Sequence, residues 1–502
     1  MSISNSMVRH TLLLSLAGCW MRGIAMLFQV WLSRRMGAAG LGLLQLITTV
    51  GLLATTLGTA GVRVASMYLT AEARGHNDPA GVHRAAACCL RYSLTVSLMA
   101  AAALFFLAPS VSTHLLNAPE AVGPLRIFAA FLPVSCLCAV LSGWFTACVK
   151  IRTLTLVELG MQLAVLGMAA LFLSRASDAA ACCRAMMLAN GLGDTGMLLL
   201  LYRLYRKAQP AGTDSSPAPW RRLLRLCLPL AGSDLLRSGL STAEQLLIPR
   251  GLTAYGLGHQ DALAAYGTVS GMVFPLMMFP AMLLYALADL LVPELARCDA
   301  AGSRTRIAYL SRRCLQMGLL FAAFTAGLLC CTAQPLALLL YQSSDAARWL
   351  QVFAPLILML YLDAIVDAML KGMGQQVASV RYNILTSALD VILLLLWLPR
   401  WGMDGYFWSF TLTHGLNFLL SIRRLLRTTR SGPQAGFCAR LLLTATVCTT
   451  LGRTLGRGIV SPAGLFCIAG GYSVIFFTLC ALWGIVGRED INWFRQLLHG
   501  RD

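Results

Sequence analysis

Four charged side chains lie inside apolar segments of the sequence and are the first candidates for chemistry. Arg22 falls midway along LLLSLAGCWMRGIAMLFQVWL, a segment without an acidic residue. A guanidinium stays protonated at physiological pH, and placing one near mid-bilayer costs between about 2.5 and 17 kcal/mol. We therefore expect Arg22 to face a central cavity and an anionic substrate. The alternative is a hydrogen bond between helices that only holds the bundle together.

The other three candidates are Arg237, Arg63 and Glu244. Asp234 precedes Arg237 by three residues, so these two side chains could instead pair on one helix face. Arg63 either reaches the cavity or extends to the membrane interface. Glu244 follows Arg237 by about two turns and shares its face, where it could serve as a gate, a proton-linked site or a static salt bridge.

Two prolines, Pro275 and Pro280, interrupt an apolar stretch that we expect to span the membrane. Proline removes a main-chain donor and kinks a helix. Inside a membrane such a kink is tolerated only beside protein or a cavity. We expect a bent gating helix here.

Other motifs argue against a cofactor or catalysis. Residues 191–196, GLGDTG, match a dinucleotide-binding pattern, but they lie in an apolar span with no preceding strand, so close helix packing explains them better. His76, His83, Cys88 and Cys89 fit no zinc spacing. We expect no cofactor, no metal site, no ATP hydrolysis and no enzyme core.

Composition places the chain among membrane proteins. Charged residues make up 12% of the 502 residues and hydrophobic residues 58%, with a mean hydropathy of +0.70, whereas soluble domains carry about 25% charged residues. The net charge of +19 is spread over short loops, where it sets topology, so we expect no nucleic-acid partner. The fold class is an all-α polytopic membrane protein.

Fourteen spans fit the apolar pattern. They are expected at 10–32, 41–70, 88–108, 124–148, 154–173, 179–202, 223–248, 262–292, 312–333, 349–370, 382–398, 403–421, 437–456 and 463–486. The first lacks a cleavage site and should be retained. With both termini in the cytoplasm, the inner segments hold 27 Lys and Arg and the outer loops ten, as the positive-inside rule requires.

The two halves repeat each other with an offset of 215 residues between Arg22 and Arg237 and 222 between Pro133 and Pro355. Six spans per repeat give both halves the same direction, with a pseudo-twofold axis along the membrane normal. We expect a six-helix lobe at 1–210, a second at 211–430 after a Pro- and Ser-rich linker, and two additional helices with a short cytoplasmic tail at 431–502.

Charged residues near span ends have plainer explanations. Asp363, Asp367 and Lys371 share one helix face, which indicates a solvated helix end with an Asp–Lys pair. Arg34, Arg35 and Arg250 occupy equivalent outer hairpins. They could receive an anionic headgroup after its transfer, but loop solvation explains them equally well.

Four segments carry a resemblance to a known family: SRRMGAAGLGLLQL, EQLLIPRGL, LVPELAR and LKGMGQQVASVRYNI. With them the chain resembles the multidrug/oligosaccharidyl-lipid/polysaccharide exporter superfamily, and within it the polysaccharide biosynthesis and sporulation stage V protein B branch, related to lipid II flippases. The resemblance covers nearly the whole chain and implies two six-helix lobes around a central cavity plus two extra helices.

The resemblance also implies a cargo. It is a polyprenyl-pyrophosphate-linked sugar moved across the cell membrane by alternating access for cell-envelope, polysaccharide or spore-cortex synthesis, with Arg22 in the role of the flippases' first-helix arginines. Drug exporters of the superfamily typically use an acidic residue in that helix, which this chain lacks. The alternatives are a cation-coupled multidrug exporter and a non-transporting membrane scaffold.

The resemblance also implies which partners the protein has and where it is located. The partners are the lipid-linked sugar, the bilayer and a coupling ion, H⁺ or Na⁺, and the chain should act as a monomer. We expect it to be a multi-pass protein of the cell membrane.

Overall fold

The computed structural model describes residues 5–208, 220–456, 458 and 461–485. Most of the expected linker after residue 208 and of the C-terminal tail lies outside the described residues. The helices are α1 (Asn5–Thr59), α2 (Val62–Gly75), α3 (Pro79–Ser110), η1 (Val111–Leu115), η2 (Pro119–Ala121), α4 (Val122–Ala147), α5 (Ile151–Ser174), α6 (Ala179–Lys207), α7 (Trp220–Tyr255), α8 (His259–Thr268), η3 (Val269–Val273), α9 (Phe274–Met278), α10 (Met282–Ala300), α11 (Arg304–Tyr341), α12 (Ser344–Phe353), η4 (Ala354–Leu356), α13 (Ile357–Gly372), α14 (Gln376–Thr429), α15 (Ala435–Leu455) and α16 (Pro462–Leu482).

The expected all-α membrane fold is confirmed. Within the described part of the chain there is no strand, and ten helical segments are long and apolar enough to cross a membrane. Two of them, Trp20–Gly75 and Gln376–Thr429, have 56 and 54 residues, well over twice the roughly 20 residues that one crossing needs. The number of fourteen spans stays a prediction.

Each of these two long segments turns at a glycine. Gly37 has φ 69° and ψ 179°, and Gly402 has φ 57° and ψ −136°, so both leave the helical region. A side chain would be strained in these conformations, whereas glycine adopts them readily. We conclude that α1 and α14 each consist of two arms joined at a glycine hinge.

The helices group into two compact units by their contacts. One unit is Met36–Gly267, and the other joins Met1–Arg35 to Thr268–Asp502. The first arm of α1 therefore belongs with the C-terminal half of the chain, and α7 belongs with the N-terminal half. This grouping differs from a simple division near residue 210, and the expected lobes and their pseudo-twofold axis stay a prediction.

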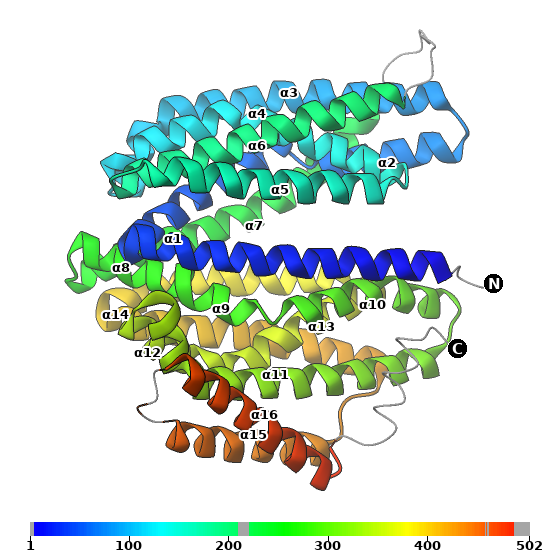
Figure 1. The fold of residues 1–502 in the computed structure, drawn as a ribbon. Helices are drawn as coiled ribbons and strands as arrows, with labels where there is room; N and C mark the ends of the chain where they lie inside the picture. The colour runs from blue at the N-terminus through cyan, green and yellow to red at the C-terminus, as the bar shows by residue number, and fades with distance from the viewer. Residues whose placement is uncertain (1–4, 209–219, 457, 459–460, 486–502) are drawn as a thin grey trace. The chain divides into compact units, whose positions relative to one another are not determined.

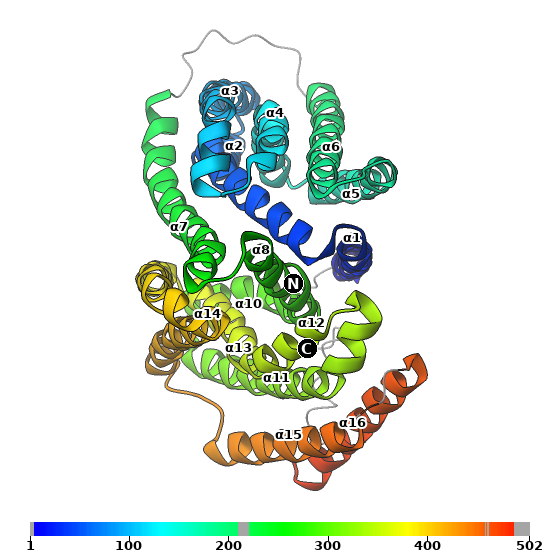
Figure 2. The ribbon, with the colours of Figure 1, turned by 90° about the vertical axis from the view of Figure 1, so that its left-hand side faces the viewer.

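In the unit Met36–Gly267, α4 packs against α2, α3 and α6, and α5 packs against α6 (Figures 1 and 2). The glycines of α6 make this packing close. A Cβ at Gly191 would lie 2.3 Å from the Phe131 ring, and a Cβ at Gly193 would lie 2.0 Å from Val165. The packing explanation of the GLGDTG motif is confirmed.

In the other unit, α11 packs against α12, α13, α15 and α16, and α13 packs against α10 and α14 (Figure 1). The contact of α11 with the last two helices has an apolar core that includes Ala323, Leu441, Tyr472 and Phe476. The expected extra helices α15 and α16 are thus attached to the C-terminal half through α11.

Candidate functional site

A polar ladder joins α7 to the second arm of α1, residues 38–59. Thr49 Oγ1 donates to Gln245 Oε1 at 2.6 Å, and Thr56 Oγ1 donates to Ser238 Oγ at 3.3 Å. The two rungs are seven residues, or about two turns, apart on each helix. The helices therefore run antiparallel along a shared polar edge.

Arg237 and Glu244 come directly before the two ladder residues of α7, Ser238 and Gln245. With 3.6 residues per turn they lie about 100° around the helix from the ladder. Arg237 is exposed and Glu244 is half-buried. The alternative pair of Arg237 with Asp234 does not form, since both side chains are exposed and the structure holds no ion pair between them.

Arg63 lies in α2 and is also exposed. The positive charge of Arg63 attracts the carboxylate of Glu158, which lies in α5 of the same unit. Sequence reasoning missed Glu158 because it is an isolated carboxylate in an apolar span, with no local motif to mark it. Arg63, Arg237 and Glu244 thus belong to one unit and bring both signs of charge to its helices.

Arg22 belongs to the other unit, on the first arm of α1. Its side chain is exposed, and no carboxylate among the described residues forms an ion pair with it. This arm is held in place by Gln29, whose Nε2 donates to the carbonyl of Gly271 at 3.0 Å. No described neighbour neutralises the guanidinium, and its role as a headgroup ligand stays a prediction.

The expected bend at the two prolines is present. Pro275 lies in the first turn of α9, and Pro280 lies in the break between α9 and α10, where the helix bends by 59°. The buried Tyr361 of α13 donates its hydroxyl to the carbonyl of Met277 at 2.6 Å. A side chain therefore satisfies a main-chain acceptor at the break.

The sequence suggested that Asp363 belongs to a solvated helix end, but the structure shows otherwise. Its Oδ2 accepts from Asn417 Nδ2 at 3.1 Å, while Asp363 Oδ1 and Asn417 Oδ1 are both buried without a hydrogen-bond partner. The expected Asp–Lys pair does form, between Asp367 and Lys371 at 2.6 Å. Sequence reasoning missed Asn417 because it approaches from the second arm of α14.

A second buried carboxylate lies between the two arms of α14. Asp390 Oδ1 accepts from Ser409 Oγ at 2.6 Å and from Thr413 Oγ1 at 3.1 Å. Two hydroxyl donors satisfy this oxygen, so Asp390 ties the arms together. Asp363 Oδ1 has no such donor, so a negative charge is less well stabilised on Asp363 than on Asp390.

Within the part of the chain that the structure describes, no three His, Cys, Asp or Glu side chains come close enough to hold a metal ion. His83, one of the residues weighed for zinc, instead places Nδ1 3.0 Å from the hydroxyl of Tyr205.

Comparison with known proteins gives the family. The family model for polysaccharide biosynthesis proteins matches residues 7–299, and the MatE model matches residues 251–396. Stage V sporulation protein B of Bacillus subtilis (strain 168) is 24% identical over 416 residues, which cover 79% of each chain. Sporulation protein YkvU of the same organism is 23% identical over 154 residues, covering 31% of this chain and 35% of that protein.

Solved structures share the fold. The lipid II flippase MurJ, in an inward closed conformation, gives a TM-score of 0.72 at 12% identity, covering 94% of this chain and 98% of that chain. An inward-facing multidrug resistance MATE transporter gives 0.62 at 14% identity, covering 82% and 95%. The family model matches more than half of the chain and shows that the chain belongs to the polysaccharide biosynthesis protein family, within the multidrug/oligosaccharidyl-lipid/polysaccharide exporter superfamily.

Proposed function

We propose that this protein is a flippase that moves a lipid-linked oligosaccharide or peptidoglycan precursor across the cell membrane by alternating access. The family and the similarity to stage V sporulation protein B over most of the chain support this class of cargo. The described helices leave no separate soluble domain for an enzyme core, which supports a transporter rather than an enzyme.

The observation that carries the cargo assignment is Arg22. A permanently charged guanidinium lies in an apolar helix, exposed, and without an ion-pair partner among the described residues. Arginine binds phosphate through paired, charge-assisted hydrogen bonds. We assign to Arg22 the pyrophosphate of a polyprenyl-linked sugar, and we propose Arg63, Arg237 and Glu244 as further substrate-binding residues.

The bend at Pro275 and Pro280 supplies the gating element of this proposal. In this proposal a helix near the cargo bends during alternating access, and a helix already broken at a proline can do so at lower cost than a continuous one. We place both termini in the cytoplasm, because that orientation puts most Lys and Arg on the inner side, and we take the monomer as the transporting unit.

We also propose that a cation, H⁺ or Na⁺, is coupled to transport near Asp363. Two buried acceptor oxygens without donors, Asp363 Oδ1 and Asn417 Oδ1, support this. A proton on Asp363 or a bound Na⁺ would satisfy oxygens that otherwise carry the cost of unmade hydrogen bonds. This step would provide the energy for cargo movement.

The test is a flipping assay in liposomes with a fluorescent polyprenyl-pyrophosphate-linked sugar. We expect Arg22→Ala to slow flipping by about tenfold to a hundredfold, because a hydrogen bond to a charged group contributes about 1.5–3 kcal/mol. Arg22→Lys should recover only part of the rate. The control Arg203→Ala removes one exposed charge at the end of α6 and should leave the rate unchanged. Unchanged flipping by Arg22→Ala would refute the role of this residue.

A second candidate is a cation-coupled drug exporter, which the MatE model match at residues 251–396 favours. The same liposomes separate the two functions when they contain a cationic dye. An exporter would move the dye with or without Arg22 and would leave the lipid-linked sugar in place. A scaffold would move neither compound, and that result would refute transport altogether.

A further inference from the structure

Two adjoining pockets lie at one end of α14, where its two arms return to the same place. One, of about 310 Å³, is lined by Gly374, Gln375, Val377, Ala378, Arg381, Tyr382 and Arg424. The other, of about 360 Å³, is lined by Tyr382, Leu420, Arg423, Arg424, Arg427 and Thr428. Tyr382 and Arg424 line both, so the two pockets lie side by side, and we call them together the α14 basic pocket.

The α14 basic pocket is strongly positive. Four arginines line it, Arg381, Arg423, Arg424 and Arg427, and neither set of lining residues contains a carboxylate. None of the four forms an ion pair with a carboxylate in the described chain. The neighbouring Asp367 is already engaged with Lys371 and with the hydroxyl of Ser379. The charge of the pocket is therefore available to a ligand.

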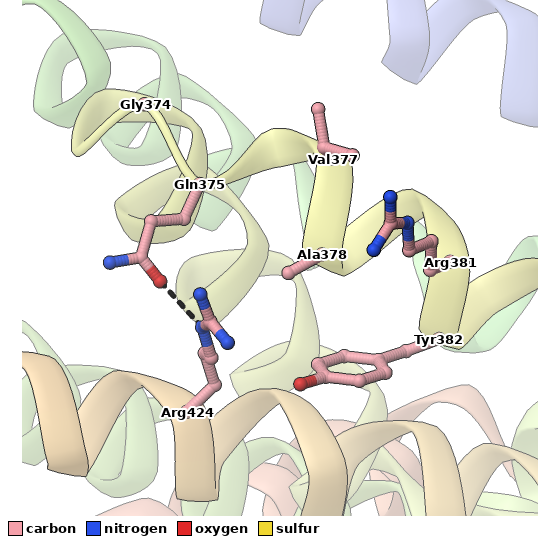
Figure 3. Close-up of a pocket in the computed structure, with 7 residues that line it drawn as sticks. All are labelled: Gly374, Gln375, Val377, Ala378, Arg381, Tyr382 and Arg424. Carbon is pink, nitrogen blue, oxygen red and sulfur yellow. Dashed lines mark hydrogen bonds between the residues drawn. The ribbon is translucent and has the colours of Figure 1, made fainter.

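The pocket is held in shape before any ligand binds. Gly374 turns the chain with φ 69°, and the main-chain N–H of Gln375 donates to the carbonyl of Leu370 at 2.8 Å. The Gln375 side chain then accepts from Arg424 Nε at 2.7 Å (Figure 3). It also donates to Thr428 Oγ1 at 3.2 Å. Arg424 is fixed through Nε alone, which leaves its two terminal NH₂ groups to bind an anion.

Apolar surface continues from the pocket along both arms of α14. Val377 and Leu385 are 59% and 60% exposed on the first arm, and Leu419 is 62% exposed on the second. A soluble anion would make no use of this surface, but acyl chains would cover it. A ligand with a phosphate and two acyl chains therefore fits the site better than free phosphate.

We propose that the α14 basic pocket binds the headgroup phosphate of an anionic membrane phospholipid, with the acyl chains along Val377, Leu385 and Leu419. Arginine is suited to this contact because its planar fork matches two phosphate oxygens. Basic pockets between membrane helices on the cytoplasmic side are known to favour anionic lipids. This site is additional to the cargo site, and its binding can be measured without transport.

Native mass spectrometry of the purified full-length protein tests the proposal with phosphatidylglycerol and phosphatidylcholine of the same acyl chains. We compare wild type with the triple variant Arg423→Gln, Arg424→Gln, Arg427→Gln. The matched control Arg203→Gln, Arg206→Gln, Lys207→Gln removes the same charge from the end of α6, which lines neither pocket. We expect the pocket variant to lose at least about tenfold in phosphatidylglycerol binding, and the control to change less than about twofold.

Three results would overturn the proposal: equal losses in both triple variants, no loss in the pocket variant, or displacement of the lipid by equimolar inorganic phosphate. The first would mean unspecific attraction by positive charge, and the last a soluble-anion site. If the triple variant does not fold, Gln375→Ala decides the question, since it frees Arg424 while leaving the charge unchanged. Binding should fall several-fold in that variant, and unchanged binding would contradict a preformed pocket.

Discussion

Arg34 donates from Nε to the main-chain carbonyl of Leu340 at 2.7 Å, although 306 residues separate the two. Its Nη2 reaches the carbonyl of Leu339 as well. Arg250, in α7, donates to the main-chain carbonyl of His114 in η1, which directly follows α3. In both cases an arginine from the first helix of one half binds carbonyls at the end of a helix of the other half.

These contacts agree with the grouping of the first arm of α1 with α11 in one unit, and of α7 with α3 and η1 in the other. The last carbonyls of a helix have no partner within the helix, and a cation near them is also favoured by the helix dipole. Arg34 supplies both a hydrogen-bond donor and a positive charge to the last turn of α11.

Removing the Arg34 anchor should destabilise the protein. We expect Arg34→Ala to lower the free energy of unfolding by about 1–3 kcal/mol, since it leaves helix-end carbonyls without a charged donor. Unfolding in a detergent titration, followed by tryptophan fluorescence, measures the change. The control Arg175→Ala removes an exposed arginine that directly follows α5 and makes no side-chain hydrogen bond among the described residues. Equal losses in the two variants would show that the contact to α11 contributes nothing.

No sequence pattern could have shown this anchor. The basic residues of the hairpins were expected either to meet a headgroup or to be solvated, because sequence spacing relates only residues on the same element. The carbonyls bound by Arg34 carry no side-chain signature, and their position depends on how α11 ends. Side chain to main chain contacts over such distances become visible only in the folded structure.

Replacing Tyr361 by phenylalanine should loosen the broken helix. Tyr361→Phe removes the donor to the Met277 carbonyl and leaves that acceptor unpaired beside the break, at a cost of about 1–3 kcal/mol. We expect a lower unfolding midpoint and faster hydrogen exchange in residues 274–285. Tyr309→Phe, at a tyrosine that is 56% exposed, is the control. If exchange in this segment is unaffected, the hydroxyl does not hold the bend.

The polar ladder between α1 and α7 should show energetic coupling. In a double-mutant cycle of Thr49→Val and Gln245→Leu we expect the losses in stability to be non-additive by about 0.6 kcal/mol, and by at most about 1.7 kcal/mol, the range found for such bonds in membranes. The control cycle replaces Thr48, whose hydroxyl donates to its own helix at the carbonyl of Leu44. Additive losses in the Thr49 cycle would mean that the rung is not energetically significant.

The elements of the fold could be predicted from the sequence where the cause is local. Apolar runs predicted the helices, the glycines of α6 predicted close packing of that helix, and the spacing of Asp367 and Lys371 predicted their ion pair. Asp363 was assigned to the same solvated end because it shares their helix face. Its burial depends on Asn417, which comes from the far arm of α14, and no periodicity relates the two.

Cargo recognition should depend on Arg237 and not on Asp234. Because the two side chains are not paired in the structure, Asp234→Asn should leave the flipping rate unchanged, whereas Arg237→Ala should reduce it about tenfold or more. The liposome assay with the lipid-linked sugar measures both. A structural salt bridge would instead make the two variants equally slow and equally unstable. Similar losses of rate and of unfolding free energy in both would therefore exclude a direct role for Arg237.

Ion coupling should be lost when Asp363 becomes asparagine. Asp363→Asn keeps the shape of the side chain but removes the negative charge that a proton or Na⁺ would neutralise, so flipping should no longer respond to an imposed H⁺ or Na⁺ gradient. The basal rate without a gradient should persist. Asp390→Asn is the control, because Ser409 and Thr413 already satisfy that carboxylate and it needs no cation. Liposomes with each gradient imposed separately also identify the ion. If Asp363→Asn still responds to both gradients as the wild type does, the unsatisfied oxygens of Asp363 and Asn417 are not the coupling site, while the assignment of cargo to Arg22 is unaffected.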